Sequence, residues 1–275
     1  MKRIRFTQAA VLLALLMMQA ASCIGGSSSK NAQAEEAEEE PLPERYENDD
    51  LPPAADELFD DFVYYFASNE QLQRRRTVFP IAVKEGKKTT MIEQEQWTMD
   101  SIFMNVGEYL LIFDKPEERE MINDTTMKKV VVEKLFLNAD SMKQYQFERK
   151  EGRWNLCEIR KQRLQGHPNA AFLKFYQQFA SDSAFQANSL ADEIAFSGAD
   201  PEDDFAQMDG FITPDSWEAF APELPQDSIY HIDYGRHDAR SKNKVLVICG
   251  ISNGMEMELA FQQKRGKWKL TRLTE

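Results

Sequence analysis

Histidine and cysteine, the residues that most often bind transition metals, are scarce in this sequence. Each occurs three times in 275 residues. His231 and His237 lie six positions apart, and neither a cysteine nor a second carboxylate accompanies them at a spacing typical of a metal site. The sequence therefore predicts no bound metal.

The sequence also lacks the short motifs of common enzymes and nucleotide-binding proteins. It contains no G-x-S-x-G turn, no Walker loop for phosphate and no glycine-rich dinucleotide-binding fingerprint. We therefore expect no cofactor. Whether the protein is an enzyme stays open, and these absences weigh against it.

Basic residues are also fewer than acidic residues. Lysine and arginine total 33 against 46 aspartates and glutamates, which gives a formal net charge of −13. Residues 23–61 alone contain 13 acidic residues against Lys30 and Arg45. Because phosphate contacts require a concentrated basic surface, we expect no nucleic-acid partner.

The N-terminal segment combines a basic start with a short apolar run. Lys2, Arg3 and Arg5 precede an unbroken apolar run over residues 9–18, which is shorter than the roughly 20 residues of a membrane-spanning helix. The small residues of "AAS" then lead directly to Cys23. This order is typical of a secretory signal that is cleaved after a small residue.

The cysteine directly after the small residues makes the segment resemble a bacterial lipoprotein signal. The resemblance implies that residues 1–22 form a lipoprotein signal peptide and that Cys23 carries acyl chains such as palmitate. Acyl chains anchor a protein to a membrane without spanning it. We therefore expect an exported protein, tethered through Cys23 to the bacterial cell envelope on its periplasmic or cell-surface face. The alternative is a secreted protein with a free Cys23.

Residues 23–54 contain almost no large apolar side chains. The segment is rich in glycine and serine, then in glutamate, and is finally interrupted by prolines. Such a composition cannot bury enough apolar surface to offset the chain entropy lost on folding. It predicts a disordered acidic linker between the membrane anchor and the folded part.

Two segments of the remaining chain occur twice. "FDDFVYYFASNEQLQ" begins at Phe59, and "FLKFYQQFASDSAFQ" begins 113 residues later at Phe172. "QFERKEGRWNLCEIR" and "AFQQKRGKWKLTRLT" place Trp154 and Trp268 at an offset of 114. Nearly equal offsets at both ends indicate two copies of one domain of about 110 residues. We assign residues 55–163 and 164–275 to the two copies.

Each copy begins with a helical pattern and ends with strand patterns. Phe59, Phe62, Val63 and Phe66 recur at the spacing of one helix face. The last strands of each copy alternate apolar and polar residues around short loops that contain glycine or asparagine. The pattern predicts an α+β fold, with helices on a curved antiparallel sheet in each copy.

Helices followed by a long curved sheet resemble the nuclear transport factor 2-like cone. The paired copies, the lipoprotein signal, and the "FxxFxxxFAS" and "GxWxL" segments resemble uncharacterised bacterial lipoproteins with tandem cones. The resemblance covers residues 55–275 and implies two tandem cone-like domains. It also implies a pocket between helices and sheet, as in the steroid isomerases and dehydratases that share this fold.

Aromatic residues are the best candidates for lining such a pocket. In "DSIYHIDYGRHD", Tyr230 and Tyr234 share one face of a strand, whereas His231 and Asp233 share the other. The apolar face should point inward, so we expect His231 and Asp233 on the solvent side and assign them no acid–base role. The pocket candidates are Tyr234, Trp217, Trp97 and Tyr109. For each of them the simpler alternative is a side chain packed in the core.

Cys157 and Cys249 occupy non-equivalent positions in the two copies, which favours two free thiols. Three functional hypotheses remain. The protein is a tethered module that binds a small molecule or a peptide, a scaffold that contacts other proteins of the cell envelope, or an isomerase-like or dehydratase-like enzyme. The resemblance in fold does not by itself assign an enzymatic function. Because the sequence also lacks a catalytic motif, we favour the binding module.

Overall fold

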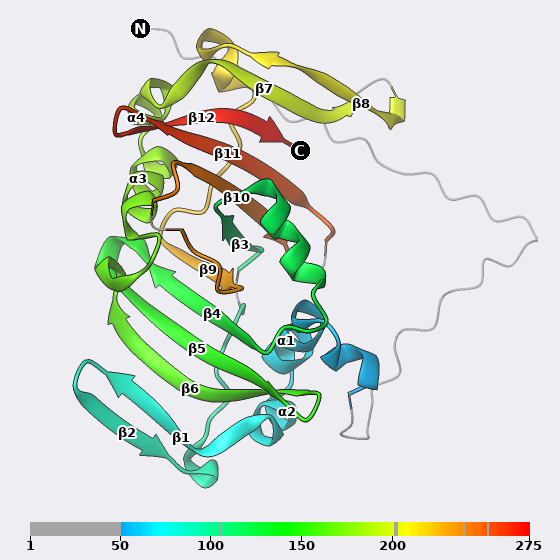
Figure 1. Ribbon diagram of the computed structural model, residues 1–275, viewed down its shortest axis with the longest axis vertical. Helices are drawn as coiled ribbons and strands as arrows, with labels where there is room; N and C mark the ends of the chain where they lie inside the picture. Colours follow the sequence, from blue (N-terminus) through cyan, green and yellow to red (C-terminus); the bar gives the residue numbers. More distant parts are fainter. Residues whose placement is uncertain (1–50, 105, 201–202, 239, 252) are drawn as a thin grey trace, which may run out of the picture. The chain divides into compact units, whose positions relative to one another are not determined.

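A computed structural model describes residues 51–275 except 105, 201–202, 239 and 252 (Figure 1). The predicted signal peptide 1–22, Cys23 and the linker up to residue 50 lie outside the described residues. The described residues form one compact unit. Within the described part of the chain, no helix is both long enough and apolar enough to cross a membrane.

Each half of this unit contains two helices followed by six strands. The first half comprises α1 (Phe59–Ser68), α2 (Glu70–Arg75), β1 (Thr77–Glu85), β2 (Lys88–Ile92), β3 (Glu108–Phe113), β4 (Lys129–Phe136), β5 (Ser141–Lys150) and β6 (Arg153–Arg163). The second comprises α3 (Ala170–Ser181), α4 (Ser183–Asn188), β7 (Leu190–Asp200), β8 (Asp203–Ile212), β9 (Ser228–Asp233), β10 (Asn243–Gly250), β11 (Glu256–Lys264) and β12 (Lys267–Thr274). Short 3-10 helices are η1 (Pro53–Asp56), η2 (Gln94–Gln96), η3 (Pro116–Asn123), η4 (Leu137–Ala139), η5 (Leu164–Gly166) and η6 (Pro214–Ala219).

Equivalent local signals build equivalent elements in the two halves. The side chain of Asn69 accepts a hydrogen bond from the backbone N–H of Leu72 at 2.9 Å and so caps α2. Asp182 caps α4 through Phe185 at the same distance. The last hairpin of each half turns at a glycine in the left-handed region, with φ of 78° at Gly152 and 80° at Gly266.

The two halves share a single twelve-stranded sheet in the order β2-β1-β6-β5-β4-β9-β3-β10-β11-β12-β7-β8 (Figure 1). When β1 is matched with β7, β2 with β8 and so on, this order reads the same from both ends. At the centre, β9 pairs with β4 and β3 pairs with β10, both antiparallel, while β3 and β9 pair in parallel. The third strand of each half is therefore exchanged into the other half.

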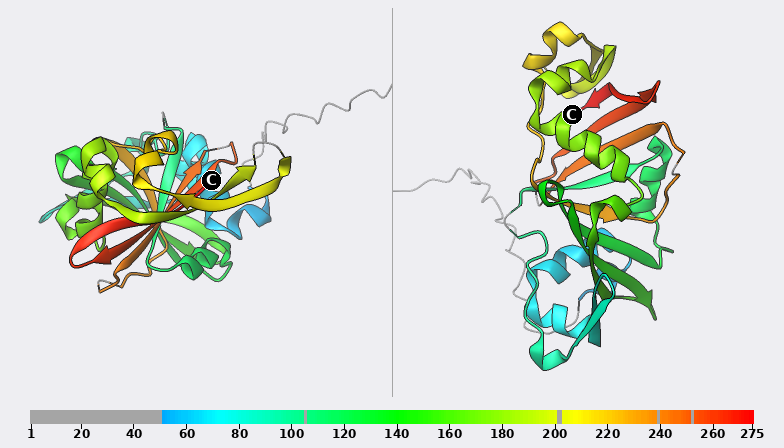
Figure 2. Two further views of the ribbon diagram at one scale, coloured as in Figure 1. Left: turned by 90° about the horizontal axis from the view of Figure 1, so that it is seen from above. Right: turned by 90° about the vertical axis from the view of Figure 1, so that its left-hand side faces the viewer.

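The helices of the two halves lie along different parts of the sheet, α1 and α2 beside the first half and α3 and α4 beside the second (Figure 2). We call the two clusters of buried side chains the α1 core and the α3 core. Leu110 and Ile112 of β3 belong to the α3 core, whereas Leu111 and Phe113 belong to the α1 core. Because alternate residues of a strand point to opposite faces, the two cores lie on opposite faces of the exchanged strands.

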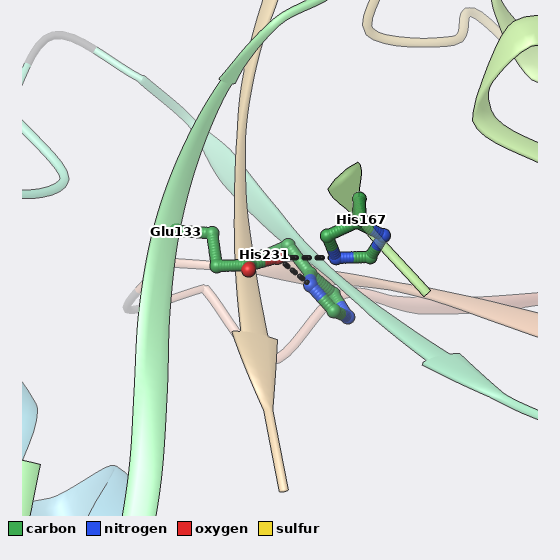
Figure 3. Close-up of side chains that lie close together, drawn as sticks. All are labelled: Glu133, His167 and His231. Carbon is green, nitrogen blue, oxygen red and sulfur yellow. Dashed lines mark hydrogen bonds and ion pairs between the residues drawn. The ribbon is translucent and has the colours of Figure 1, made fainter. Parts of the chain in front are cut away.

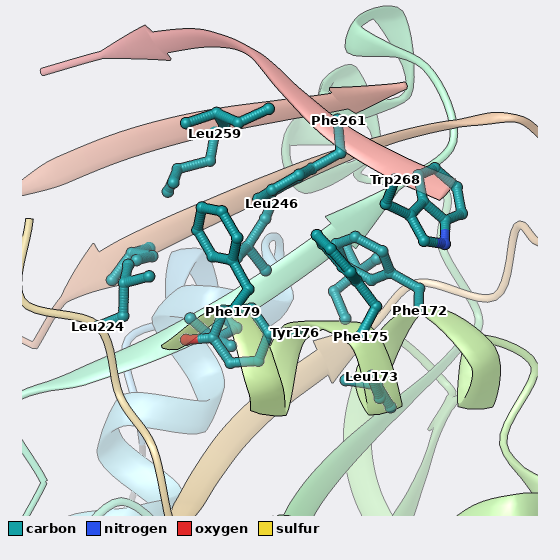
Figure 4. Close-up of a cluster of buried hydrophobic side chains, with 14 of the residues drawn as sticks. Phe172, Leu173, Phe175, Tyr176, Phe179, Leu224, Leu246, Leu259, Phe261 and Trp268 are labelled. Atoms are coloured by element: carbon teal, nitrogen blue, oxygen red, sulfur yellow. The ribbon is translucent and has the colours of Figure 1, made fainter. Parts of the chain in front are cut away.

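Repeated aromatic contacts hold each helix on its sheet. In the α3 core, the ring centroid of Phe172 lies 5.3 Å from that of Trp268 and 5.4 Å from that of Phe261 (Figure 4). In the α1 core, Phe59 lies 5.0 Å from Trp154 and 5.3 Å from Phe147. Edge-to-face rings at these distances stabilise each helix on its sheet by about 0.5–1.5 kcal/mol per pair beyond their area burial.

The predicted α+β fold, with helices on a large curved sheet, is confirmed. The prediction of two separate cone-like domains, 55–163 and 164–275, is not confirmed, because the described residues form one sheet and one compact unit. Each core also takes side chains from the other half: Tyr230 and Ile232 complete the α1 core, and Leu110 completes the α3 core. Strand exchange is the physical reason, since neither half retains its own third strand.

Candidate functional site

A carboxyl group and two phenols meet where the first turn of α1 contacts the central strands of the sheet. Asp60 lies in the first turn of α1, Tyr109 in β3 and Tyr234 directly after β9. The Tyr109 hydroxyl donates to Oδ2 of Asp60 at 3.4 Å, and the Tyr234 hydroxyl donates to Oδ1. The exchange of β9 into the first half brings Tyr234 to this position.

These groups adjoin a cavity of about 150 Å³, which we call the Asp60 pocket. Its wall combines the carboxyl group with aromatic and aliphatic side chains from α1, from the loop before β3 and from the ends of the central strands. The lining residues are Asp60, Val63, Tyr64, Phe103, Tyr109, Ile232, Gly250 and Ile251. A few polar groups in a mainly apolar hollow are typical of a small-ligand site.

Burial controls the protonation of this site. Burial raises the pKa of Asp60 above its usual value, although the hydrogen bonds from Tyr234 and Tyr109 oppose the rise. Burial and the nearby Asp60 also raise the pKa of both tyrosines, so the phenols stay protonated and available as donors. Burial raises the pKa of the neighbouring Cys249 thiol to about 11, so Cys249 is not a thiolate nucleophile at neutral pH.

The internal repeat shows which positions correspond to this site in the other half. Val131 of β4 pairs with Asp233 of β9, and Val245, 114 residues after Val131, pairs with Phe113 of β3. Position 113 in β3 therefore corresponds to position 233 in β9. The helices correspond at an offset of 113, as the repeated segments indicate.

The corresponding positions in the second half are mostly aliphatic. Asp60 corresponds to Leu173, Tyr109 to Ile229, and Cys249 to Leu135, and all three aliphatic residues belong to the α3 core. Tyr234 corresponds to Asp114, which is polar but bonds to Lys244 instead. Since the fold is built with leucine and isoleucine at three of the four positions, the polar cluster around Asp60 is not needed for packing.

The structure brings together two of the four pocket residues proposed from the sequence, Tyr109 and Tyr234. The other two are packed in the cores: Trp97 lies 5.7 Å from the Phe79 ring, and the Trp217 indole donates to Gln186 at 2.9 Å. Neither lines the Asp60 pocket. Cys157 and Cys249 are free thiols, as the sequence favoured.

Sequence reasoning missed Asp60. It sits in the acidic pair Asp60-Asp61, which is typical of an exposed helix start. One available signal was the repeat itself, because an aspartate stands where the second copy has Leu173.

A second polar cluster lies on the opposite face of the sheet, around Glu133 (Figure 3). Oε2 of Glu133 is 2.7 Å from Nε2 of His167 and 2.8 Å from Nδ1 of His231, and Oε1 accepts from Gln144 at 2.6 Å. Burial alone would raise the pKa of Glu133, but the hydrogen bonds from His167 and His231 outweigh it and hold the pKa well below its usual value. Glu133 is therefore a buried carboxylate held by imidazole and amide donors.

The prediction that His231 faces solvent is wrong, because its side chain is 1% exposed. Exchange places β9 in the middle of the sheet, where both faces are covered, so alternation along the strand no longer separates core from solvent. Asp233, on the same face, is partly buried and lies 3.0 Å from Nε2 of His237. The prediction placed Asp233 on the solvent side, whereas the structure shows it partly buried.

Glu133, His167 and His231 place three potential ligand atoms within 4.8 Å of one another, which sequence spacing did not reveal. The hydrogen bonds indicate a different role. Nδ1 of His167 accepts the backbone N–H of Asn169 at 2.9 Å, so the ring proton of a neutral His167 is on Nε2, facing Glu133. A metal at Nε2 would have to displace that proton from a ring whose other nitrogen is already an acceptor. The donor set fits a hydrogen-bonded carboxylate better than a metal centre.

Comparison with known proteins identifies the fold. The chain is similar to the crystal structure of an NTF2-like protein from Bacteroides fragilis NCTC 9343, with 36% identity and a TM-score of 0.74, over 82% of this chain and 98% of that chain. It also aligns with an NTF-2 like protein of unknown function from Silicibacter pomeroyi DSS-3 over 38% of this chain and 87% of that one. This second likeness, with 14% identity and a TM-score of 0.25, supports no inference.

The first of these matches confirms an NTF2-like fold for the described residues. None of the curated proteins compared with the chain matches it. The sequence pattern of one family, described as a domain of unknown function (DUF4348), matches residues 38–275. The chain belongs to the DUF4348 family.

Proposed function

We propose that the protein is a binding module that takes a small ligand, or one side chain of a peptide, in the Asp60 pocket. The observation that carries this proposal is the contrast between the two halves. Asp60 and Tyr109 line a cavity in one half, whereas Leu173 and Ile229 fill the corresponding place in the other. A buried carboxylate without a cationic partner lowers stability even where phenols donate to it, so a function is the simplest reason for keeping Asp60.

The size of the pocket limits the ligand. Drug-sized ligands occupy cavities of roughly 300–1,000 Å³, whereas an engineered cavity of about 150 Å³ holds benzene. The Asp60 pocket, at about 150 Å³, therefore takes a group of the size of one ring or one side chain. A larger molecule would insert only such a part.

The N-terminal segment suggests where in the cell this module binds its ligand. If Cys23 carries the acyl chains that its position suggests, the acidic segment after it would tether the folded unit to the cell envelope. The ligand would then come from the space outside the cytoplasmic membrane. A lipid tether keeps a binding module close to its membrane at high local concentration.

One specific observation supports each of two alternatives to the binding module, an enzyme and a scaffold. Asp60, with its raised pKa beside two phenols, suits an isomerase-like or dehydratase-like acid–base reaction. Phe211 on the outer strand β8 is 72% exposed and Met208 on the same strand 41%, which suits a scaffold that contacts an envelope protein. The exposed residues of β8 do not explain the contrast between the two halves, whereas the Asp60 cluster would serve either a binding site or an acid–base reaction.

A fragment screen by NMR tests the binding proposal. Val63, Ile232 and Ile251 line the pocket and carry methyl groups, whereas Ile194 in the α3 core serves as an internal control. Ring-sized neutral, cationic and anionic compounds should include some that shift the three pocket methyls and leave Ile194 unchanged. Hits that all map elsewhere, or no hits at all, would contradict the proposal.

A further inference from the structure

We infer that the ligand of the Asp60 pocket carries an organic ammonium group, an inference that rests on the proposed binding function. The ammonium would pair with the Asp60 carboxylate and place its alkyl substituents against the aromatic rings of the pocket. Its source is either a free small amine or the side chain of a lysine in a peptide.

The hydrogen bonds at Asp60 indicate an ionised carboxylate that lacks a positively charged partner. Tyr109 donates to one carboxylate oxygen and Tyr234 to the other, which an ionised carboxylate accommodates without a proton of its own. The neighbouring charge that acts on Asp60 is that of Asp61, which has the same sign. Among the described residues, the groups that act on the Asp60 carboxyl are Tyr234, Tyr109 and Asp61, and none of these is a cation. A cationic ligand would supply the missing partner.

The aromatic wall adds a second attraction for a cation. Tyr64, Phe103 and Tyr109 line the same cavity as Asp60, and the ring centroids of Phe103 and Tyr109 lie 5.8 Å apart. Aromatic faces attract ammonium groups, and quaternary ammonium ligands are recognised by such rings. Tyr64 is 52% exposed, so one aromatic side chain of the cavity wall is also accessible to solvent.

The backbone at Phe103 is unusual in a way that matches this role. Its φ is +59°, in the left-handed region that bulky residues rarely adopt. The other non-glycine residues with positive φ in the described part of the chain are Asp140, Glu151 and Arg265, and they lie at turns between strands. Phe103 instead supplies a ring to the pocket, and a strained residue at a cavity is a common feature of binding sites.

Electrostatics also disfavour the other charge classes. An anionic ligand would meet the Asp60 carboxylate inside the pocket, with the like charge of Asp61 next to it at the start of α1. A neutral ligand would bury Asp60 further without giving it a counter-charge. An ammonium group alone meets both the carboxylate and the aromatic rings with favourable interactions.

Three probes of similar size test the inference with the full chain. Choline and 3,3-dimethylbutan-1-ol have nearly the same shape and differ in charge, and n-butylammonium represents a lysine side chain. We expect choline or n-butylammonium to shift the methyl signals of Val63, Ile232 and Ile251 and to bind roughly tenfold more tightly than the alcohol. Preference for choline would indicate a small quaternary amine, and preference for n-butylammonium a lysine side chain.

Asp60→Asn and Asp61→Asn form a matched pair of variants. Both remove one charge from the start of α1, but Asp61 is exposed and does not line the pocket. Asp60→Asn should abolish the preference for the cation over the alcohol, and Asp61→Asn should retain it. Equal binding of choline and alcohol to the unmodified chain would overturn the inference without any variant.

The outcomes separate this inference from the proposed function. If the alcohol shifts the pocket methyls and neither cation does so more tightly, the ammonium inference fails while the binding module stands. If none of the three probes and no fragment shifts those methyls, both fail.

Discussion

Tyr234 and Asp60 are 174 residues apart, and the phenol of one donates a hydrogen bond to the carboxylate of the other. The contact exists because β9, which ends directly before Tyr234, pairs with β4 of the first half. In a chain whose halves kept their own third strands, Tyr234 would face the helix of the second half instead. The candidate site is thus a product of strand exchange.

Tyr234→Phe should raise the pKa of Asp60 further. The variant keeps the ring and removes the hydroxyl whose hydrogen bond lowers that pKa. Tyr109→Phe should have the smaller effect, because the Tyr109 contact is longer, at 3.4 Å. Titration of the Asp60 carboxyl carbon by NMR measures both shifts, and an unchanged or lowered pKa in Tyr234→Phe would show that the hydrogen bond is absent.

Exchanging the corresponding residues of the two halves should have unequal effects. Asp60→Leu places the residue of the second half in the first and should change the free energy of unfolding by less than about 1 kcal/mol. Leu173→Asp buries an unpaired carboxylate in the α3 core and should cost about 3 kcal/mol or more. Urea unfolding compares the two, and a larger loss for Asp60→Leu would mean that Asp60 is structural.

Glu133→Gln should lower stability at pH 7 by about 1.5–3 kcal/mol, because the buried hydrogen bonds from His167 and His231 lose their charged acceptor. The folded state lowers the pKa of Glu133 below the ordinary value of 4.5. The carboxylate therefore contributes stability above about pH 4.5 and loses it as the pH falls further.

The stability difference between the unmodified chain and Glu133→Gln should accordingly shrink below pH 4.5. Urea unfolding at several pH values measures it, and Glu95→Gln, at an exposed position, is the control for loss of one charge. A difference that stays constant down to low pH would refute the assigned hydrogen bonding.

Cys23→Ser should release the protein from the membrane fraction, because the serine cannot carry the acyl chains that the N-terminal sequence predicts. Cys157→Ser, which removes a free thiol within the folded unit, should leave membrane association unchanged. Fractionation of cells followed by immunoblotting gives the answer. Continued membrane association of Cys23→Ser would point to a different anchor.

Local structure was predictable because its signals are local. The repeated phenylalanines beginning at Phe59 and Phe172 predict the helices that the structure shows, and Gly152 and Gly266 mark the hairpin turns. Both signals act within a few residues, where helix period and turn geometry leave little choice.

The exchange of β3 and β9 was not predictable in this way. Both strands are short and mostly buried, and a pattern of buried residues does not say which neighbour a strand pairs with. Because the pairing of β9 was unknown, His231 was wrongly placed on the solvent side. A strand in the middle of a sheet with both faces covered has no solvent side. Asp60 and Glu133 find their partners only once that pairing is known.

The pairing of β4 is the most direct test of this account. Val132 of β4 lies opposite Ile232 of β9 in the exchanged sheet. We expect interstrand backbone NOEs between these two residues and their neighbours along β4 and β9. NOEs that join β4 to β3 of its own half instead would contradict strand exchange, and with it the meeting of Asp60 and Tyr234.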